Sequence, residues 1–104
     1  MPLYFVRHQH LPERCPARDP VAAQALLDHL DRGNAQRLGV SVHAEAVLDA
    51  KHVLVIIAET EDMSFLDDLM APFRQAGTVE ISAASTCETV VARHGCEPVD
   101  AAGN

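Results

Sequence analysis

The segment His52–Glu59, HVLVIIAE, decides the fold because it contains an uninterrupted apolar run, Val53–Ile57. A strand that faces water on one side alternates polar and apolar residues, whereas a continuous apolar run is typical of a strand covered on both faces. The preceding segment, Val40–Leu48, does alternate, and Asp49–Lys51 between the two is short enough for a hairpin turn. We therefore expect His52–Glu59 to be a central strand that forms a hairpin with Val40–Leu48.

On either side of this hairpin the chain alternates between strand-like and helix-like segments. The strand-like segments are Leu3–His10, Val40–Leu48, His52–Glu59, Thr78–Ala84 and a short fifth strand at Thr89–Arg93. One helix begins at Asp19 and Pro20, because aspartate is a good N-cap and proline suits the first helical turn. A second helix follows Thr60 and ends at Gly77. The order β-α-β-β-α-β predicts an α+β ferredoxin-like sandwich with a short fifth strand, strand order 4-1-3-2 and both helices on one face.

This arrangement leaves one face of the sheet without a covering layer. Apolar residues such as Tyr4, Val6 and those of Val53–Ile57 would then remain in contact with water, and a second copy of the chain is the simplest cover. We therefore expect a homodimer in which two sheets form a dimeric α/β barrel. Each chain would contribute one domain over residues 1–96, followed by a flexible C-terminal tail at residues 97–104.

The composition excludes several classes of partner. The 104-residue chain has 15 acidic and 8 basic residues and a formal net charge of −7, which disfavours nucleic acid and anionic membranes. No apolar run approaches the roughly 20 residues of a membrane-spanning helix. The N-terminus lacks the basic and apolar regions of a signal peptide, so we expect a cytoplasmic protein with reduced cysteines. Glycine-rich nucleotide-binding motifs are absent, and no residues that bind an organic cofactor are predicted.

The opening run Tyr4–Pro12, YFVRHQHLP, adds a resemblance to the pattern of elements. Over about residues 3 to 93 the chain resembles the dimeric α/β-barrel superfamily. Its members pack two such sheets face to face and include small monooxygenases, isomerases, ligand-sensing domains and metal-binding proteins. The run itself is similar to the first strand of small nickel-binding members, which carry histidines where that strand ends. The resemblance implies a homodimer and a transition-metal site near this strand end.

Two histidines of the first strand point to the same chemistry. His8 and His10 lie two residues apart, so their side chains project from the same face of a strand. If Leu3 and Phe5 face the helices, both imidazoles lie on the uncovered face. We expect the second strand to begin at the end of the sheet where the first strand stops, which would bring His43 to the same place.

Cys15 lies five residues beyond His10 in a loop bounded by prolines and can supply a thiolate to the same centre. Imidazole and thiolate ligands suit nickel, copper and zinc, and ligand type alone does not choose among these metals. The candidate metal ligands are His8, His10, Cys15 and His43.

Each of these residues also has a simpler interpretation. Two histidines can be ordinary polar residues at a strand end, and Arg14 and Arg18 could instead make Cys15 a reactive thiol. Cys87 and Cys96 could pair with each other, or one of them could approach the site of a partner subunit. The remaining histidines, His29, His52 and His94, are interpreted as surface residues.

Three classes of function therefore remain open. The leading hypothesis is a small homodimeric protein that stores, buffers or senses a transition metal. The alternative is a cofactor-independent monooxygenase or isomerase that uses His8, His10 or His43 as general acid or base on a small molecule in the barrel cavity. The third is an accessory or ligand-sensing domain in which the histidines have no chemical role.

Overall fold

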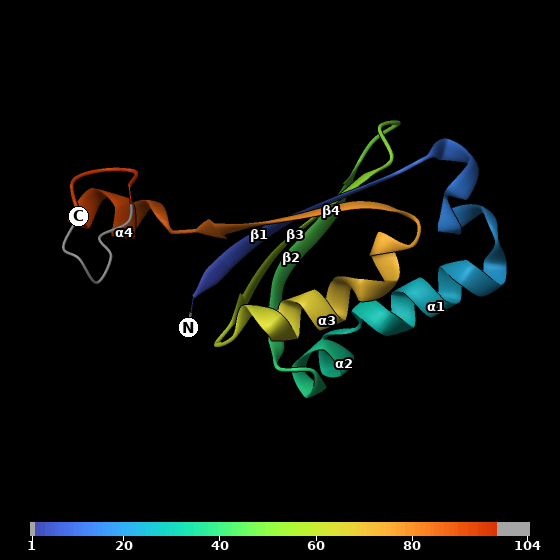
Figure 1. Cartoon of the computed structure of the whole chain (residues 1–104), viewed down its shortest axis with the longest axis horizontal. Coiled ribbons are helices and arrows are strands. Elements are labelled where there is room, and N and C mark those ends of the chain that lie inside the picture. The colour runs from blue at the N-terminus through green and yellow to red at the C-terminus, as the bar shows by residue number, and fades with distance from the viewer. Residues whose placement is uncertain (1, 98–104) are drawn as a thin grey trace.

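The computed structural model, which describes residues 2–97, contains one antiparallel four-stranded sheet with helices on one side (Figure 1). Its elements are β1 (Leu3–His10), α1 (Pro20–Leu30), α2 (Arg32–Arg37), β2 (Val40–Leu48), β3 (Val53–Thr60), α3 (Met63–Arg74), β4 (Gly77–Ala84) and α4 (Cys87–Ala92), with short 3-10 turns η1 (Pro12–Arg14) and η2 (Pro16–Arg18) after β1. The sheet order is β2-β3-β1-β4. This confirms the ferredoxin-like α+β fold and the central place of the apolar strand β3.

The hydrophobic core lies between the sheet and α3. Val6 of β1 and Ile56 of β3 are almost fully buried against Leu66, Leu69 and Met70 of α3. Helices α1, α2 and α3 all lie on this side of the sheet (Figure 1), and no helix in residues 2–97 is long and apolar enough to cross a membrane. The opposite side of the sheet, called the open face below, has no covering layer among residues 2–97.

Side-chain caps fix where the two long helices begin. The carboxylate of Asp19 accepts a hydrogen bond from the backbone N–H of Val21 at 3.1 Å, as expected for the start of α1. Helix α3 is capped by Asp62, which accepts from Ser64 N–H at 2.9 Å. The expected cap, Thr60, instead donates its hydroxyl proton to the carbonyl oxygen of Gly39 at 2.9 Å, so it joins β3 to the start of β2.

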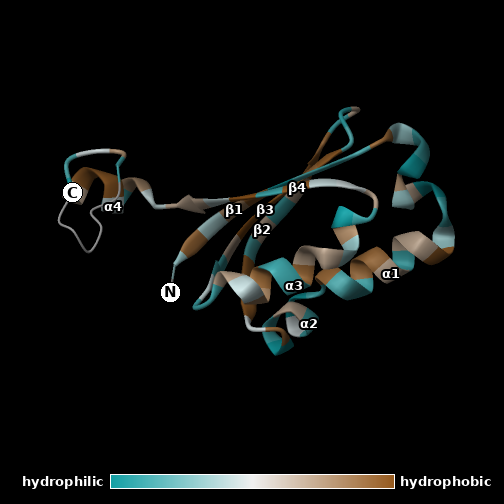
Figure 2. Ribbon diagram, in the orientation of Figure 1, coloured by the Kyte–Doolittle hydropathy of each residue, from teal (hydrophilic) through white to brown (hydrophobic). Residues whose placement is uncertain are grey.

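The predicted fifth strand is wrong, because Cys87–Ala92 forms the helix α4. Thr86 caps this helix by accepting from the backbone N–H of Thr89 at 3.2 Å, a local signal that competes with the β-branched residues of the segment. Helix α4 follows β4 and projects away from α1 and α3, with hydrophobic residues along it (Figure 2). The predicted tail, residues 97–104, lies outside the described residues except for Glu97.

Two expectations about the direction of side chains and strands are also wrong. Phe5 is on the open face and 37% exposed, whereas Val6 and His8 are buried on the helix side, so the faces of β1 are the reverse of those expected. Because β1 and β2 are both antiparallel to β3, they run parallel to each other. Residue His43 of β2 therefore lies near the start of β1, at the end of the sheet opposite His10.

Candidate metal centre

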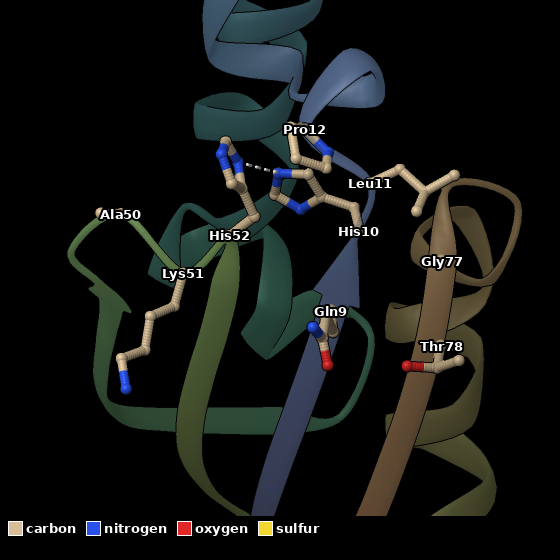
Figure 3. A pocket seen from close by; sticks show the side chains of 9 residues that line it. All are labelled: Gln9, His10, Leu11, Pro12, Ala50, Lys51, His52, Gly77 and Thr78. Atoms are coloured by element: carbon tan, nitrogen blue, oxygen red, sulfur yellow. Dashed lines mark hydrogen bonds between the residues drawn. The ribbon is translucent and has the colours of Figure 1, made fainter.

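Three potential ligands from different segments meet where β1 ends. His10 is the last residue of β1, Cys15 lies between η1 and η2, and His52 immediately precedes β3. One ligand atom from each lies within 4.8 Å of the other two, and all three residues are partly buried. His52 Nδ1 and His10 Nε2 are 3.3 Å apart, and Figure 3 shows the two rings side by side above the sheet.

The hairpin turn between β2 and β3 positions His52. Its backbone has a φ of 55°, in the left-handed region that most residues other than glycine avoid. The backbone N–H of His10 donates to the carbonyl oxygen of His52 at 3.2 Å, which continues the pairing of β1 and β3 beyond the end of the strands. This pairing holds the two imidazoles next to each other.

Two 3-10 turns and one side-chain hydrogen bond constrain the loop that carries Cys15. Pro12 and Pro16 each begin a 3-10 turn, and the backbone N–H of Cys15 donates to the carbonyl oxygen of Pro12 at 3.3 Å. The guanidinium of Arg14 donates to the carbonyl oxygen of Gln75 at 2.8 Å and so fastens the loop to the end of α3. The thiol is therefore presented to the strand end by a constrained backbone.

The distances fit a tetrahedral ion with little rearrangement. Bonds of 2.0–2.1 Å at a tetrahedral angle separate two nitrogen ligands by about 3.3 Å, which matches the 3.3 Å between Nε2 of His10 and Nδ1 of His52. For a metal–sulfur bond of 2.3 Å, the sulfur should lie about 3.6 Å from each nitrogen. Cys15 therefore needs to approach by no more than about 1.2 Å from the 4.8 Å limit, within the reach of a side-chain rotation.

The electrostatic environment keeps His10 neutral. Burial lowers the pKa of His10 below its usual value, and the nearby His8 and His52 lower it further because their charges would repel an imidazolium. The ligand atom in the tetrahedral fit is Nε2 of His10, which faces Nδ1 of His52, whereas Nδ1 of His10 is buried without a hydrogen-bond partner among the described residues. A neutral imidazole with a lone pair available is the form that binds a metal ion.

His8 lies behind this cluster and not within it. Its side chain is 3% exposed, its Nδ1–H donates to the carbonyl oxygen of Thr78 at 2.9 Å, and its ring packs edge-on against Phe73 with centroids 5.1 Å apart. Burial lowers the pKa of His8, and the hydrogen bond to Thr78 opposes that shift. Its ring lies 5.4 Å from that of His10, so His8 supports the ring of His10 from the core side.

His43, the fourth predicted ligand, is part of a separate feature on the open face. Its Nε2 lies 2.8 Å from a carboxylate oxygen of Glu59. The pair borders a hollow of about 480 Å³ that also includes Leu3 and Ile57. The structure therefore brings His10 and Cys15 together and leaves His8 and His43 outside the cluster.

His52 was interpreted from the sequence as a surface residue, yet the signal for its position was present. In the order 4-1-3-2 the first strand lies antiparallel to the third, so the end of one faces the beginning of the other. Gln9 pairs with Val53, which places His10 opposite His52. The parallel course of β1 and β2 follows from the same topology and removes His43 from this end.

The comparisons with known proteins support the fold and do not extend to function. No protein-family model matches the chain, and neither does any curated protein. The structure is similar to that of Rv0793 from Mycobacterium tuberculosis, with 17% sequence identity, 83% of this chain and 95% of that chain covered, and a TM-score of 0.52. A crystal structure of an antibiotic biosynthesis monooxygenase gives 14% identity, 83% and 98% coverage, and a TM-score of 0.49. The chain therefore shares the ferredoxin-like fold with Rv0793, and similarity to nickel-binding members in particular remains an expectation.

Proposed function

We propose that this protein binds one transition-metal ion per chain through His10, Cys15 and His52. The observation that carries the proposal is the convergence of two imidazoles and a thiol within 4.8 Å at the end of β1. Imidazole and thiolate together favour zinc, copper or nickel over calcium or magnesium, which prefer oxygen ligands. Three protein ligands leave one position of a tetrahedral ion open, which suits a protein that buffers, senses or passes on its metal.

This function requires Cys15 to remain reduced. A reducing compartment keeps such a thiol free of disulfides. We therefore propose a cytoplasmic location. In an oxidising environment Cys15 could be lost as a ligand, because only the thiolate binds metal.

Cobalt substitution tests the site directly. Untagged protein loaded with Co²⁺ should bind one ion per chain and show a thiolate-to-cobalt charge-transfer band, which Cys15→Ser should abolish. Cys87→Ser is the matched control, because Cys87 is an exposed cysteine on α4, and it should leave the band unchanged. A band that survives Cys15→Ser, or a stoichiometry unaffected by His10→Ala, would contradict the proposal.

The second candidate function is a cofactor-independent monooxygenase or isomerase activity on the open face. It is favoured by the 2.8 Å contact between His43 and Glu59 beside a hollow of about 480 Å³. A carboxylate that accepts the Nε2 proton of His43 leaves Nδ1 unprotonated and able to remove a proton from a substrate. A register shift between Val42 and Ala44 sets His43 out of the regular pairing, as bulges beside active sites often do.

A screen of metal-free protein with small phenols and lactones, followed by oxygen uptake and by isomer analysis, tests this second function. Turnover should fall by about 10²- to 10⁴-fold in His43→Gln. Glu59→Gln should reduce it less, since the base remains in place. Turnover that persists in His43→Gln, or that appears only after metal is added, would argue against a catalytic role for this pair.

We further propose that the open face is covered by a second copy of the chain. Phe5 and Ile57 lie on the two central strands and are 37% and 40% exposed there, and Leu48 on the edge strand β2 is 42% exposed. Apolar exposure on central strands is unusual in a monomer. Two-fold pairing would bury these residues against themselves and enclose the hollow at His43. Sedimentation should give a dimer for the native protein and a monomer for Ile57→Lys. A native protein that sediments as a monomer at micromolar concentration would refute the dimer.

A further inference from the structure

Two of the three candidate metal ligands, His10 and His52, border a hollow of about 420 Å³ that also contains Lys51, the only lysine of the chain. His10 and His52 form one side of this hollow, and Gln9 and Thr78 line its floor on the sheet. Figure 3 shows the Lys51 side chain extending away from the two imidazoles, so its ammonium group is separated from the ligand atoms. A volume of this size lies within the range of small-molecule sites.

The position of Lys51 is notable because the chain as a whole is acidic, with a formal net charge of −7. Within residues 2–97 its ammonium makes no salt bridge, although 15 acidic residues are present in the whole chain. An unpaired cation beside a hollow is available to an anionic ligand. Gln9 and Thr78 add an amide and a hydroxyl that can donate hydrogen bonds to the same ligand.

The charges around the hollow fall into two separate centres. A divalent ion held by the Cys15 thiolate and two neutral imidazoles has a net charge of +1 and one open coordination position. Lys51 supplies a second charge of +1, and its flexible side chain, which extends away from the imidazoles in Figure 3, has to turn toward them for one small ligand to reach both centres. A ligand with one carboxylate at each end would neutralise both centres, whereas a monocarboxylate or a single phosphate group would reach only one.

We propose that this hollow binds a small dicarboxylate, with one carboxylate on the open position of the metal ion and the other paired with Lys51. This inference rests on the proposed metal site at His10, Cys15 and His52, and it identifies the class of ligand that the metal-loaded protein takes. Gln9 and Thr78 stabilise the dicarboxylate between its two charged ends. The bound ligand completes the coordination of the metal and links metal content to the supply of the dicarboxylate.

The experiment titrates the cobalt-loaded protein with succinate, acetate and inorganic phosphate and follows the visible spectrum of the ion. Succinate should bind more tightly than acetate or phosphate. Lys51→Met should weaken succinate by about fivefold, the effect of one partly exposed ion pair, and leave acetate unchanged. Lys51→Arg should restore most of the affinity for succinate. Because Lys51 is exposed in a turn, both variants should fold and bind one Co²⁺ ion per chain.

The outcomes separate the two proposals. Three results would overturn the dicarboxylate site in a protein that still binds one Co²⁺ ion per chain: equal affinities for succinate and acetate, tighter binding of phosphate than of succinate, or no effect of Lys51→Met. Each of them would leave the proposed metal site unaffected. Failure of the native protein to bind cobalt would overturn both.

Discussion

Replacing His52 by asparagine should remove most of the metal-dependent stabilisation while leaving the metal-free protein nearly unchanged. His52 has a φ of 55°, and asparagine tolerates this left-handed conformation better than most residues. The ring of His52 contacts that of His10 with centroids 5.2 Å apart, a contact worth about 0.5–1.5 kcal/mol. The small loss of contact and the small relief of strain should nearly cancel in the metal-free state.

The metal-bound state should behave differently because His52 is one of the three proposed ligands. At a free metal concentration of about 100 times Kd, binding to the folded state alone stabilises it by about 2.7 kcal/mol. For a domain of this size that corresponds to an increase in Tm of roughly 10–20 °C. If His52→Asn weakens binding about a hundredfold, the same metal concentration stabilises the protein by only about 0.4 kcal/mol, or roughly 2–3 °C.

Thermal unfolding followed by circular dichroism, with Zn²⁺ or with chelator, measures both quantities. His94→Asn is the matched control, since His94 is exposed, lies outside the cluster and also has a positive φ of 64°. It should retain the full metal-dependent shift. A shift in His52→Asn equal to that of the native protein would refute the assignment of His52 as a ligand.

Three further predictions concern the surroundings of the site. His8→Ala should lower the free energy of unfolding of the metal-free protein by about 2–4 kcal/mol in denaturant titrations, because it leaves a cavity beside Phe73 and an unpaired carbonyl at Thr78. The variant should still bind one Co²⁺ ion per chain. The pKa values of His8 and His10 are lower in the folded protein than in the unfolded chain, so the folded protein binds fewer protons. The contribution of these residues to the free energy of unfolding should therefore be complete above about pH 6.5 and should decline as the pH falls below it. A metal-free protein that is equally stable at pH 5 and pH 7.5 would contradict this. Gly77→Ala should disrupt the pairing of β4 with β1, because the added Cβ would lie 1.9 Å from the carbonyl oxygen of Gln9, and its unfolding midpoint should fall well below that of the native protein.

Much of the fold could be predicted from the sequence because each element has a strong local signal. The apolar run Val53–Ile57 indicated a central strand, although its open face is not covered and Ile57 is 40% exposed there. The pair Asp19 and Pro20 marked the start of α1. The segment expected as the strand Thr89–Arg93 carries two opposing local signals: Val90 and Val91 favour a strand, whereas Thr86 caps a helix through the backbone N–H of Thr89. The cap prevails, and the segment forms most of α4.

The site was only half predicted, since it depends on which face of a strand is buried. The alternation in Leu3–His10 is weak, because Leu3, Tyr4, Phe5 and Val6 are all apolar, and a shift of one residue exchanges every side chain between faces. Burial of Val6 and His8 against α3 decides the matter, and that packing is a tertiary property. His52 required in addition the pairing of β1 with β3, which brings together residues that are 42 positions apart.

The two candidate sites are independent because of the topology that separates them. Strand β1 has eight residues, and at about 3.3 Å per residue its two ends lie roughly 23 Å apart. The proposed metal ligands lie at one end of this strand, and the pair of His43 and Glu59 lies at the other. Substitutions this distant and without shared partners should act additively. A protein in which His52→Asn abolishes both metal binding and turnover would therefore have a single site that uses the metal, whereas loss of turnover in His43→Gln alone would establish two functions on one sheet.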